Sequence, residues 1–145
     1  MISDQRHLGG LRGRYALPGE IEIAGTVRGL ASLAQSLRSL KKKTVLSLPE
    51  LSLDEVKPYD SSITAIELQL SEGKVKIVRE DNVLLISGTP EHMAAFADNI
   101  LFLVEQVSRE GSEEVSSHSH IEFYEGHLWL ASDSQPIVIS MVESN

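Results

Sequence analysis

The chain has 145 residues, no cysteine and a formal net charge of −8 at pH 7. Hydrophobic residues make up 41% and charged residues 23%, a composition typical of a folded globular protein, and the lack of cysteine excludes disulfides and thiol chemistry. No stretch resembles a signal peptide or is apolar enough to span a bilayer, so we expect a cytoplasmic protein with no membrane partner.

The charge is unevenly distributed along the chain. Residues 1–18 hold three arginines against one aspartate, a net +2, whereas residues 101–145 hold eight acidic residues against one arginine, a net −7. An acidic field repels nucleic acid and favours a basic protein partner. We therefore expect no nucleic-acid ligand, although acidity of this kind also serves solubility alone.

The N-terminal residues 1–15 have no clear hydrophobic pattern and are predicted to be a flexible extension before a single domain of residues 16–145. A strand, a Gly-Thr turn and an amphipathic helix follow within residues 21–40. Three lysines at residues 41–43 suit the negative end of the helix dipole and mark the helix end.

Strands are predicted after this helix. The alternation of Ile66, Leu68 and Leu70 with polar residues indicates a strand with one face exposed to solvent. The predicted strands cover residues 44–48, 63–70, 75–78 and 83–86.

Residues 84–103 repeat the pattern of residues 21–40. Gly88-Thr89 matches Gly25-Thr26 at a constant offset, and apolar positions further along match as well. In the second copy Thr89 is a good helix N-cap, Pro90 suits the first helical position and Glu91 suits the positive end of the dipole. We interpret this as a duplication with pseudo-repeats at about residues 19–70 and 82–142.

The elements add up to an α+β fold: two helices packed on one face of a largely antiparallel sheet, with an internal βαββ-like duplication. The last two strands are predicted at residues 118–124 and 136–142.

The segment HSHIEFYEGH, residues 118–127, raises the question of a site. In a strand Ile121 and Phe123 would point inward, and the histidines and Glu122 outward. Two histidines at i and i+2 can chelate a divalent ion, but a plain polar strand face is the alternative. The weak metal candidates are His118, His120, Glu122 and His127.

Signals for catalysis are poor. Gly9-Gly10 does not follow a predicted strand, so no phosphate loop is expected, and no Gly-x-Ser-x-Gly nucleophile elbow exists. We expect no catalytic residues and no cofactor. Trp129, the only tryptophan, suits either an interface anchor or a half-buried core position.

Residues 87–103, SGTPEHMAAFADNILFL, followed by residues 118–139, HSHIEFYEGHLWLASDSQPIVI, resemble the Immunity protein 32 family of bacterial polymorphic-toxin systems. Glu125 stands where this pattern would have a proline. The shared positions are Ser87, Gly88, Ala97, Asn99, His118, His120, Glu122, Gly126, His127, Ser134 and Pro136.

The resemblance implies a non-enzymatic immunity protein that binds and neutralises a cognate toxin, and the acidity suits a basic nuclease as that toxin. Two alternatives stay open: a small metal-binding protein or enzyme that uses the His118/His120 strand, and an oligomerising domain that pairs strand edges as a homodimer. The candidate toxin contacts are Glu122, Tyr124, Glu125, His127 and Trp129, with Glu113 and Glu114 as steering charges.

Overall fold

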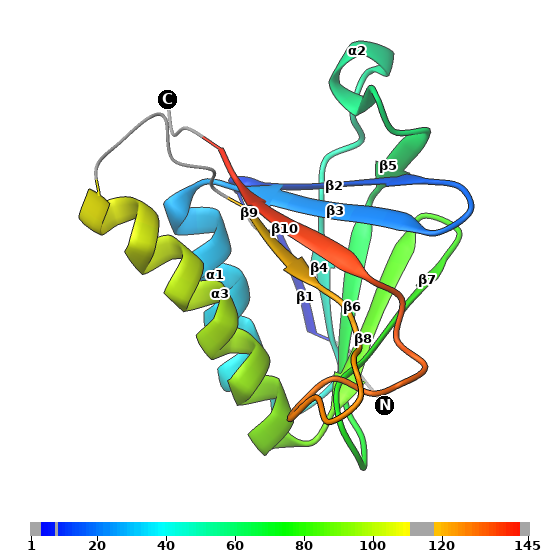
Figure 1. The fold of residues 1–145 in the computed structure, drawn as a ribbon. Coiled ribbons are helices and arrows are strands. Elements are labelled where there is room, and N and C mark those ends of the chain that lie inside the picture. The colour runs from blue at the N-terminus through cyan, green and yellow to red at the C-terminus, as the bar shows by residue number, and fades with distance from the viewer. Residues whose placement is uncertain (1–3, 8, 111–117, 143–145) are drawn as a thin grey trace.

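The computed structural model describes residues 4–7, 9–110 and 118–142 (Figure 1). Runs of strands are separated by helices along this part of the chain. They are β1 (Asp4–His7), β2 (Leu11–Ala16), β3 (Glu20–Gly25), α1 (Val27–Arg38), β4 (Thr44–Ser47), α2 (Leu53–Val56), β5 (Ser61–Ile63), β6 (Ala65–Leu70), β7 (Lys76–Glu80), β8 (Val83–Gly88), α3 (Pro90–Glu110), β9 (His118–Ile121) and β10 (Ile137–Met141).

The α+β class is confirmed, but the strands form two mixed sheets where one largely antiparallel sheet was expected. Sheet A has the order β1-β4-β6-β8-β7, and sheet B has the order β5-β2-β3-β10-β9. The division follows from the helices: α1 carries the chain from β3 in sheet B to β4 in sheet A, and α3 carries it back from β8 to β9. In Figure 1 the strands of the two sheets run across one another.

The topology contains the same pattern twice. The run β2-β3-α1-β4-β6 corresponds, element by element, to the run β7-β8-α3-β9-β10. Four neighbouring strands of sheet A have the order β4-β6-β8-β7. Their counterparts, β9-β10-β3-β2, are neighbours in the same order in sheet B. The pairing repeats as well, because β6–β8 and β3–β10 are both parallel. Each sheet therefore takes two of these strands from each repeat, and β1 and β5 are added at one edge of sheet A and sheet B respectively.

The prediction of a flexible extension at residues 1–15 was wrong, because β1 and β2 lie there. β2 pairs antiparallel with both β3 and β5. Gly13 obscured the strand in the sequence, since it occupies an inward position where a Cβ atom would lie 2.8 Å from Ile63. A glycine in the middle of a strand is a sign of such close approach.

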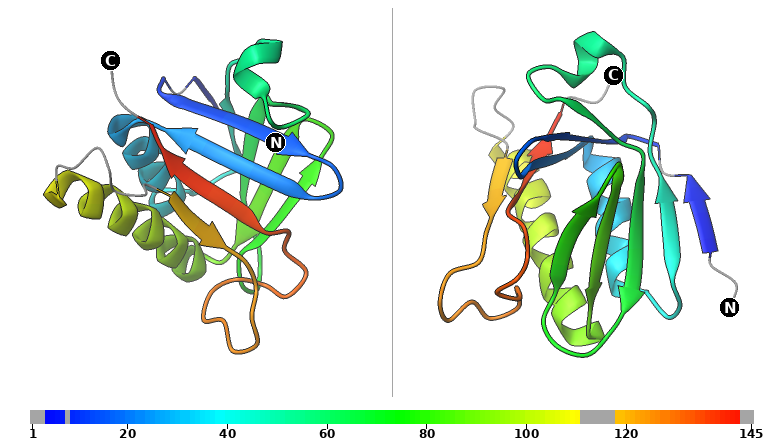
Figure 2. Two further views of the ribbon diagram at one scale, coloured as in Figure 1. Left: turned by 45° about the horizontal axis from the view of Figure 1, so that its top comes forward. Right: turned by 90° about the vertical axis from the view of Figure 1, so that its right-hand side faces the viewer.

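The two predicted helices, α1 and α3, begin where the sequence predicts, whereas the short helix α2 was not predicted. The Oγ1 atoms of Thr26 and Thr89 accept the N–H groups of Gly29 and His92, each at 3.1 Å, and cap α1 and α3. α1 and α3 lie side by side (Figures 1 and 2), with an ion pair between Arg38 and Asp98. Buried side chains from both helices and both sheets form one hydrophobic cluster. Within the described residues no helix has the length and apolarity needed to cross a membrane.

Candidate functional site

The strand β9 is shorter than predicted and ends at Ile121. Ile121 lies opposite Ile137 in the ladder with β10 and is buried, whereas Phe123 is 37% exposed. The prediction that Phe123 points inward was therefore wrong, because alternation of side chains holds only while the chain stays in the ladder. Residues 122–136 form a loop, called here the β9–β10 loop.

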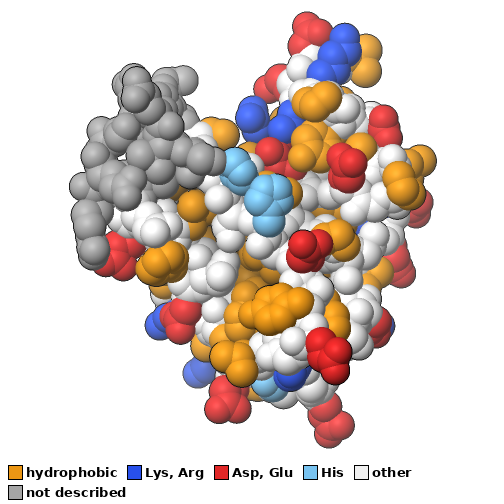
Figure 3. Space-filling view, viewed as in Figure 1, with side chains coloured by type: hydrophobic (Ala, Val, Ile, Leu, Met, Phe, Trp, Pro, Cys, Tyr) orange, Lys and Arg blue, Asp and Glu red, His pale blue; other side chains and the backbone are white. Residues whose placement is uncertain are grey.

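The histidines on β9 do face outward. His118 and His120 are both exposed, and their rings lie edge to face with centroids 5.0 Å apart. On the space-filling surface, histidine side chains appear where β9 and β10 lie (Figure 3).

His127 lies inside the β9–β10 loop and holds its turn. Only 7% of the residue is exposed, and its Nδ1 atom accepts the N–H groups of Trp129 at 3.3 Å and Leu130 at 3.1 Å. Gly126, at φ 90°, provides the left-handed backbone that starts this turn. Burial, and then the charge of Lys74, hold the pKa of His127 below its ordinary value. His127 is thus a structural residue, and its prediction as a surface contact was wrong.

The same loop closes the edge of sheet A beside β7. The N–H of Val75 donates to the carbonyl of Trp129 at 2.8 Å, and the N–H of Ala131 donates back to Val75 at 2.7 Å. The hydroxyl of Ser134 donates to the carbonyl of Val75 at 3.0 Å and accepts the N–H of Ile77 at 3.1 Å. These bonds fix the loop backbone to a sheet edge that would otherwise be open.

Trp129 packs against the helix layer. Its ring stacks on buried Phe96 with centroids 5.2 Å apart, and it meets the His127 ring edge to face at 4.8 Å. The indole is half-buried. Trp129 therefore anchors the loop to α3, which is the core role that the sequence left open.

Other side chains of the loop face solvent. Tyr124 is 63% and Leu128 81% exposed, and the Tyr124 ring lies 4.6 Å from the His127 ring. We call the exposed set the loop surface, and it consists of Glu122, Phe123, Tyr124, Glu125 and Leu128. Figure 3 shows exposed hydrophobic side chains with carboxylates beside them in the lower part of the molecule, where this loop lies.

A cleft of about 380 Å³ adjoins the loop surface at the end of β9. His120 and Glu122 lie on its wall, together with Glu20 and Tyr59 from the other side, and Ile21 and Val138 provide apolar lining. Burial and then the nearby Glu22 carboxylate raise the pKa of Tyr59, Arg14 opposes this, and Glu20 adds to it. The cleft therefore combines an apolar lining with two exposed carboxylates.

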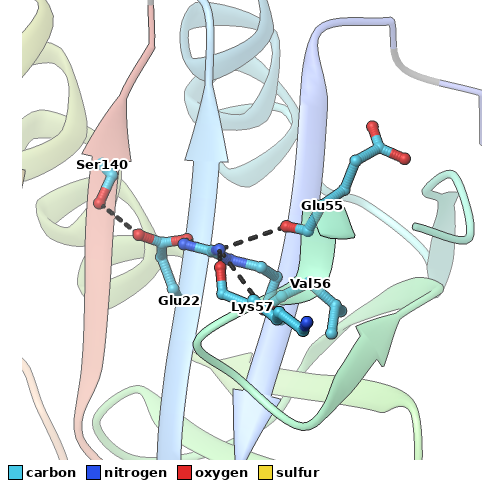
Figure 4. Close-up of polar contacts among 6 residues, drawn as sticks. Glu22, Glu55, Val56, Lys57 and Ser140 are labelled. Atoms are coloured by element: carbon cyan, nitrogen blue, oxygen red, sulfur yellow. Dashed lines mark hydrogen bonds and ion pairs between the residues drawn. The ribbon is translucent and has the colours of Figure 1, made fainter. Parts of the chain in front are cut away.

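An ion pair on sheet B supports this cleft. The Nε of Arg14 donates to the Glu22 carboxylate at 2.8 Å, and the hydroxyl of Ser140 donates to the other Glu22 oxygen at 3.0 Å (Figure 4). Arg14 also donates to the carbonyl of Lys57 at 2.8 Å and stands over the Tyr59 ring at 4.4 Å. The segment after α2 is thereby held on the sheet, and Arg14 is neutralised within the fold.

The arrangement of the described residues does not support a metal site. In that part of the chain no group of three or more His, Cys, Asp or Glu side chains is arranged to hold an ion. His127 does not join His118 and His120, because its Nδ1 already accepts two backbone N–H groups. The predicted steering charges Glu113 and Glu114 lie outside the described residues.

Comparison with models of protein families gives a match. The model of the family described as Immunity protein 32 matches residues 20–47 and 83–142, which include β3, α1 and β4 from one repeat and β8, α3, β9 and β10 from the other. No curated protein and no solved structure matches the chain.

Proposed function

This chain belongs to the Immunity protein 32 family, and on that premise we propose that it binds a cognate bacterial toxin through the loop surface and neutralises it stoichiometrically, without catalysing a reaction. The family match supports an immunity-type function. The toxin, the contact residues and the absence of catalysis belong to our proposal.

The observation that carries the proposal is the contrast between a fixed loop backbone and exposed apolar side chains. Hydrogen bonds to Val75 and Ile77 hold the loop in place, yet Tyr124 and Leu128 are largely in solvent. Binding through a backbone that is already ordered avoids the entropic cost of ordering it. Aromatic side chains at such positions are typical anchors of protein interfaces.

Of the predicted contacts, Glu122, Tyr124 and Glu125 are exposed and belong to the loop surface. Trp129 and His127 support that surface from below, through the Phe96 stack and the turn. We add Phe123, which was predicted to point inward, and Leu128, which was not among the predicted contacts.

The net charge of −8 favours a basic toxin, and we propose a nuclease, since enzymes that bind nucleic acid carry basic surfaces. Glu122 and Glu125 flank the apolar residues and would steer such a partner and select against acidic ones. A protein of this kind acts where the toxin would do damage, and we therefore place it in the cytoplasm of the producing cell.

The test is co-expression with the product of the neighbouring gene, followed by purification of the complex. We expect growth to be restored only when this chain is present, and inhibition of the purified toxin to be complete at equimolar amounts. Protection by a small fraction of one equivalent would indicate an enzyme that modifies the toxin. A neighbouring product that is not toxic, or whose toxicity persists, would remove the proposal.

A further inference from the structure

The two repeats differ at one sheet edge. By the topological correspondence β9 is the counterpart of β4, and each pairs antiparallel with the next strand of its own repeat. β4 has a second neighbour, β1, which pairs with it in parallel, with Asp4 opposite Thr44 and His7 opposite Ser47. In the described part of the chain no strand pairs with the corresponding edge of β9. Figure 2 (right) shows β1 outside β4 on one side of the molecule and β9 as the outermost strand on the other.

We propose that the toxin supplies an extended, basic segment that adds to the outer edge of β9, the edge away from β10, in parallel, as β1 adds to β4. This rests on the proposed function and extends its site from the loop surface to the neighbouring strand. Addition of a strand to an exposed sheet edge is a general mode of peptide recognition, in which backbone hydrogen bonds contribute affinity and pockets select side chains.

The chemistry beside β9 selects a basic segment. The cleft is lined by residues of β9, β10 and the start of β3, so a long side chain of an added strand would reach it by passing over the end of β9 beside Glu122. Its carboxylates, Glu20 and Glu122, match an arginine or lysine head, and its apolar lining matches the aliphatic part of such a side chain. Arg14 does not oppose this cation, because Glu22 already neutralises it.

A second copy of the chain fits this edge less well. β1 of a copy already pairs with its own β4, so its transfer to β9 would break as many strand contacts as it forms.

Two proline variants, at neighbouring residues of β9, test the strand. Successive N–H groups along a strand point to opposite edges, so one of Ser119→Pro and His120→Pro removes an N–H that faces β10 and the other removes one that faces outward. The variant whose thermal unfolding matches the wild type identifies the outward position. That variant is expected to bind the neighbouring-gene toxin at least tenfold more weakly, and wild-type affinity would overturn the inference.

Hydrogen exchange keeps the inference testable if neither proline variant folds. With the full chain and the neighbouring-gene toxin, backbone amides of β9 should exchange at least tenfold more slowly in the complex than in the free protein. A complex that leaves β9 exchange unchanged would overturn strand addition and leave the proposed function standing. If no complex forms, the proposed function itself fails. Slow β9 exchange in the free protein, together with a dimeric mass, would assign the edge to a second copy and overturn the inference.

The basic side chain has its own test. Glu20→Gln and Glu122→Gln together should weaken toxin binding at least tenfold, whereas Glu80→Gln with Glu91→Gln, which removes two exposed carboxylates elsewhere, should change it less than twofold. Equal effects of the two pairs would show that only the overall charge matters and would overturn the assignment of the cleft.

Discussion

The Nδ1 atom of His127 accepts the backbone N–H of Leu130 at 3.1 Å, and this bond gives His127 a structural role in the histidine-rich segment. A residue that the sequence offered as a metal ligand or a toxin contact instead closes a turn beneath the loop surface. Its ring also supports the ring of Tyr124, 4.6 Å away. The buried histidine thus links the fold to the proposed binding surface.

Replacing His127 by alanine should lower the free energy of unfolding by about 1–3 kcal/mol, because two N–H groups in the loop lose their acceptor. Urea denaturation measures this change. His120→Ala, at an exposed position on β9, should cost less than about 0.5 kcal/mol. Similar losses in the two variants would contradict the role given to His127.

The stability should also fall in mild acid. Since the pKa of buried His127 is below its ordinary value of 6.5, the unfolded chain takes up a proton as the pH falls through 6.5, while the folded chain does so only at lower pH. The free energy of unfolding should therefore decrease below pH 6.5 and be insensitive to this group above it. Urea denaturation at pH 7.5 and 5.5 should give a larger decrease for the wild type than for His127→Gln. Identical decreases would rule out His127 as the source.

Ser134→Ala should loosen the contact between the β9–β10 loop and β7, since the hydroxyl bonds both Val75 and Ile77. We expect a loss of about 1–2 kcal/mol in the free energy of unfolding and faster hydrogen exchange at Ile77. Ser132→Ala, at an exposed position of the same loop, is the matched control and should change neither quantity. An unaffected Ile77 amide in Ser134→Ala would show that the loop is held by other contacts.

Association with the toxin should depend on salt. Exposed carboxylates act through long-range attraction, which is screened over about 8 Å at physiological ionic strength. Glu122→Gln with Glu125→Gln should slow association severalfold at low salt and reduce its salt dependence, as measured by stopped flow. Glu50→Gln, an exposed carboxylate before α2, is the control. A toxin whose association rate does not change with salt would argue against a basic partner.

Local signals in the sequence predicted much of the fold. Thr89 caps α3 as expected, its counterpart Thr26 caps α1, and the amphipathic pattern identified both segments as helices with one buried face. The repeat of Gly25-Thr26 and Gly88-Thr89 marks positions that correspond in the topology. These features depend on hydrogen bonds and spacing within a few residues, which a sequence displays directly.

Features that depend on distant partners were missed. Gly13 looked like part of a flexible segment, because the side chain of Ile63 that excludes a Cβ atom there is remote in sequence. His127 looked like a ligand, because the amides that it caps become neighbours only once the loop docks on β7. The second sheet was missed for the same reason, since strand pairing across repeats leaves no local pattern.

The most direct test of the loop surface compares two leucines with nearly equal exposure, Leu128 at 81% and Leu53 at 82%. Each is replaced by serine, and binding to the toxin from the neighbouring gene is measured by isothermal titration calorimetry. If the loop surface binds the toxin, Leu128→Ser should weaken the affinity at least tenfold, about 1.4 kcal/mol, while Leu53→Ser, on α2, binds like the wild type. Wild-type affinity for Leu128→Ser, or an equal loss in both variants, would contradict our account.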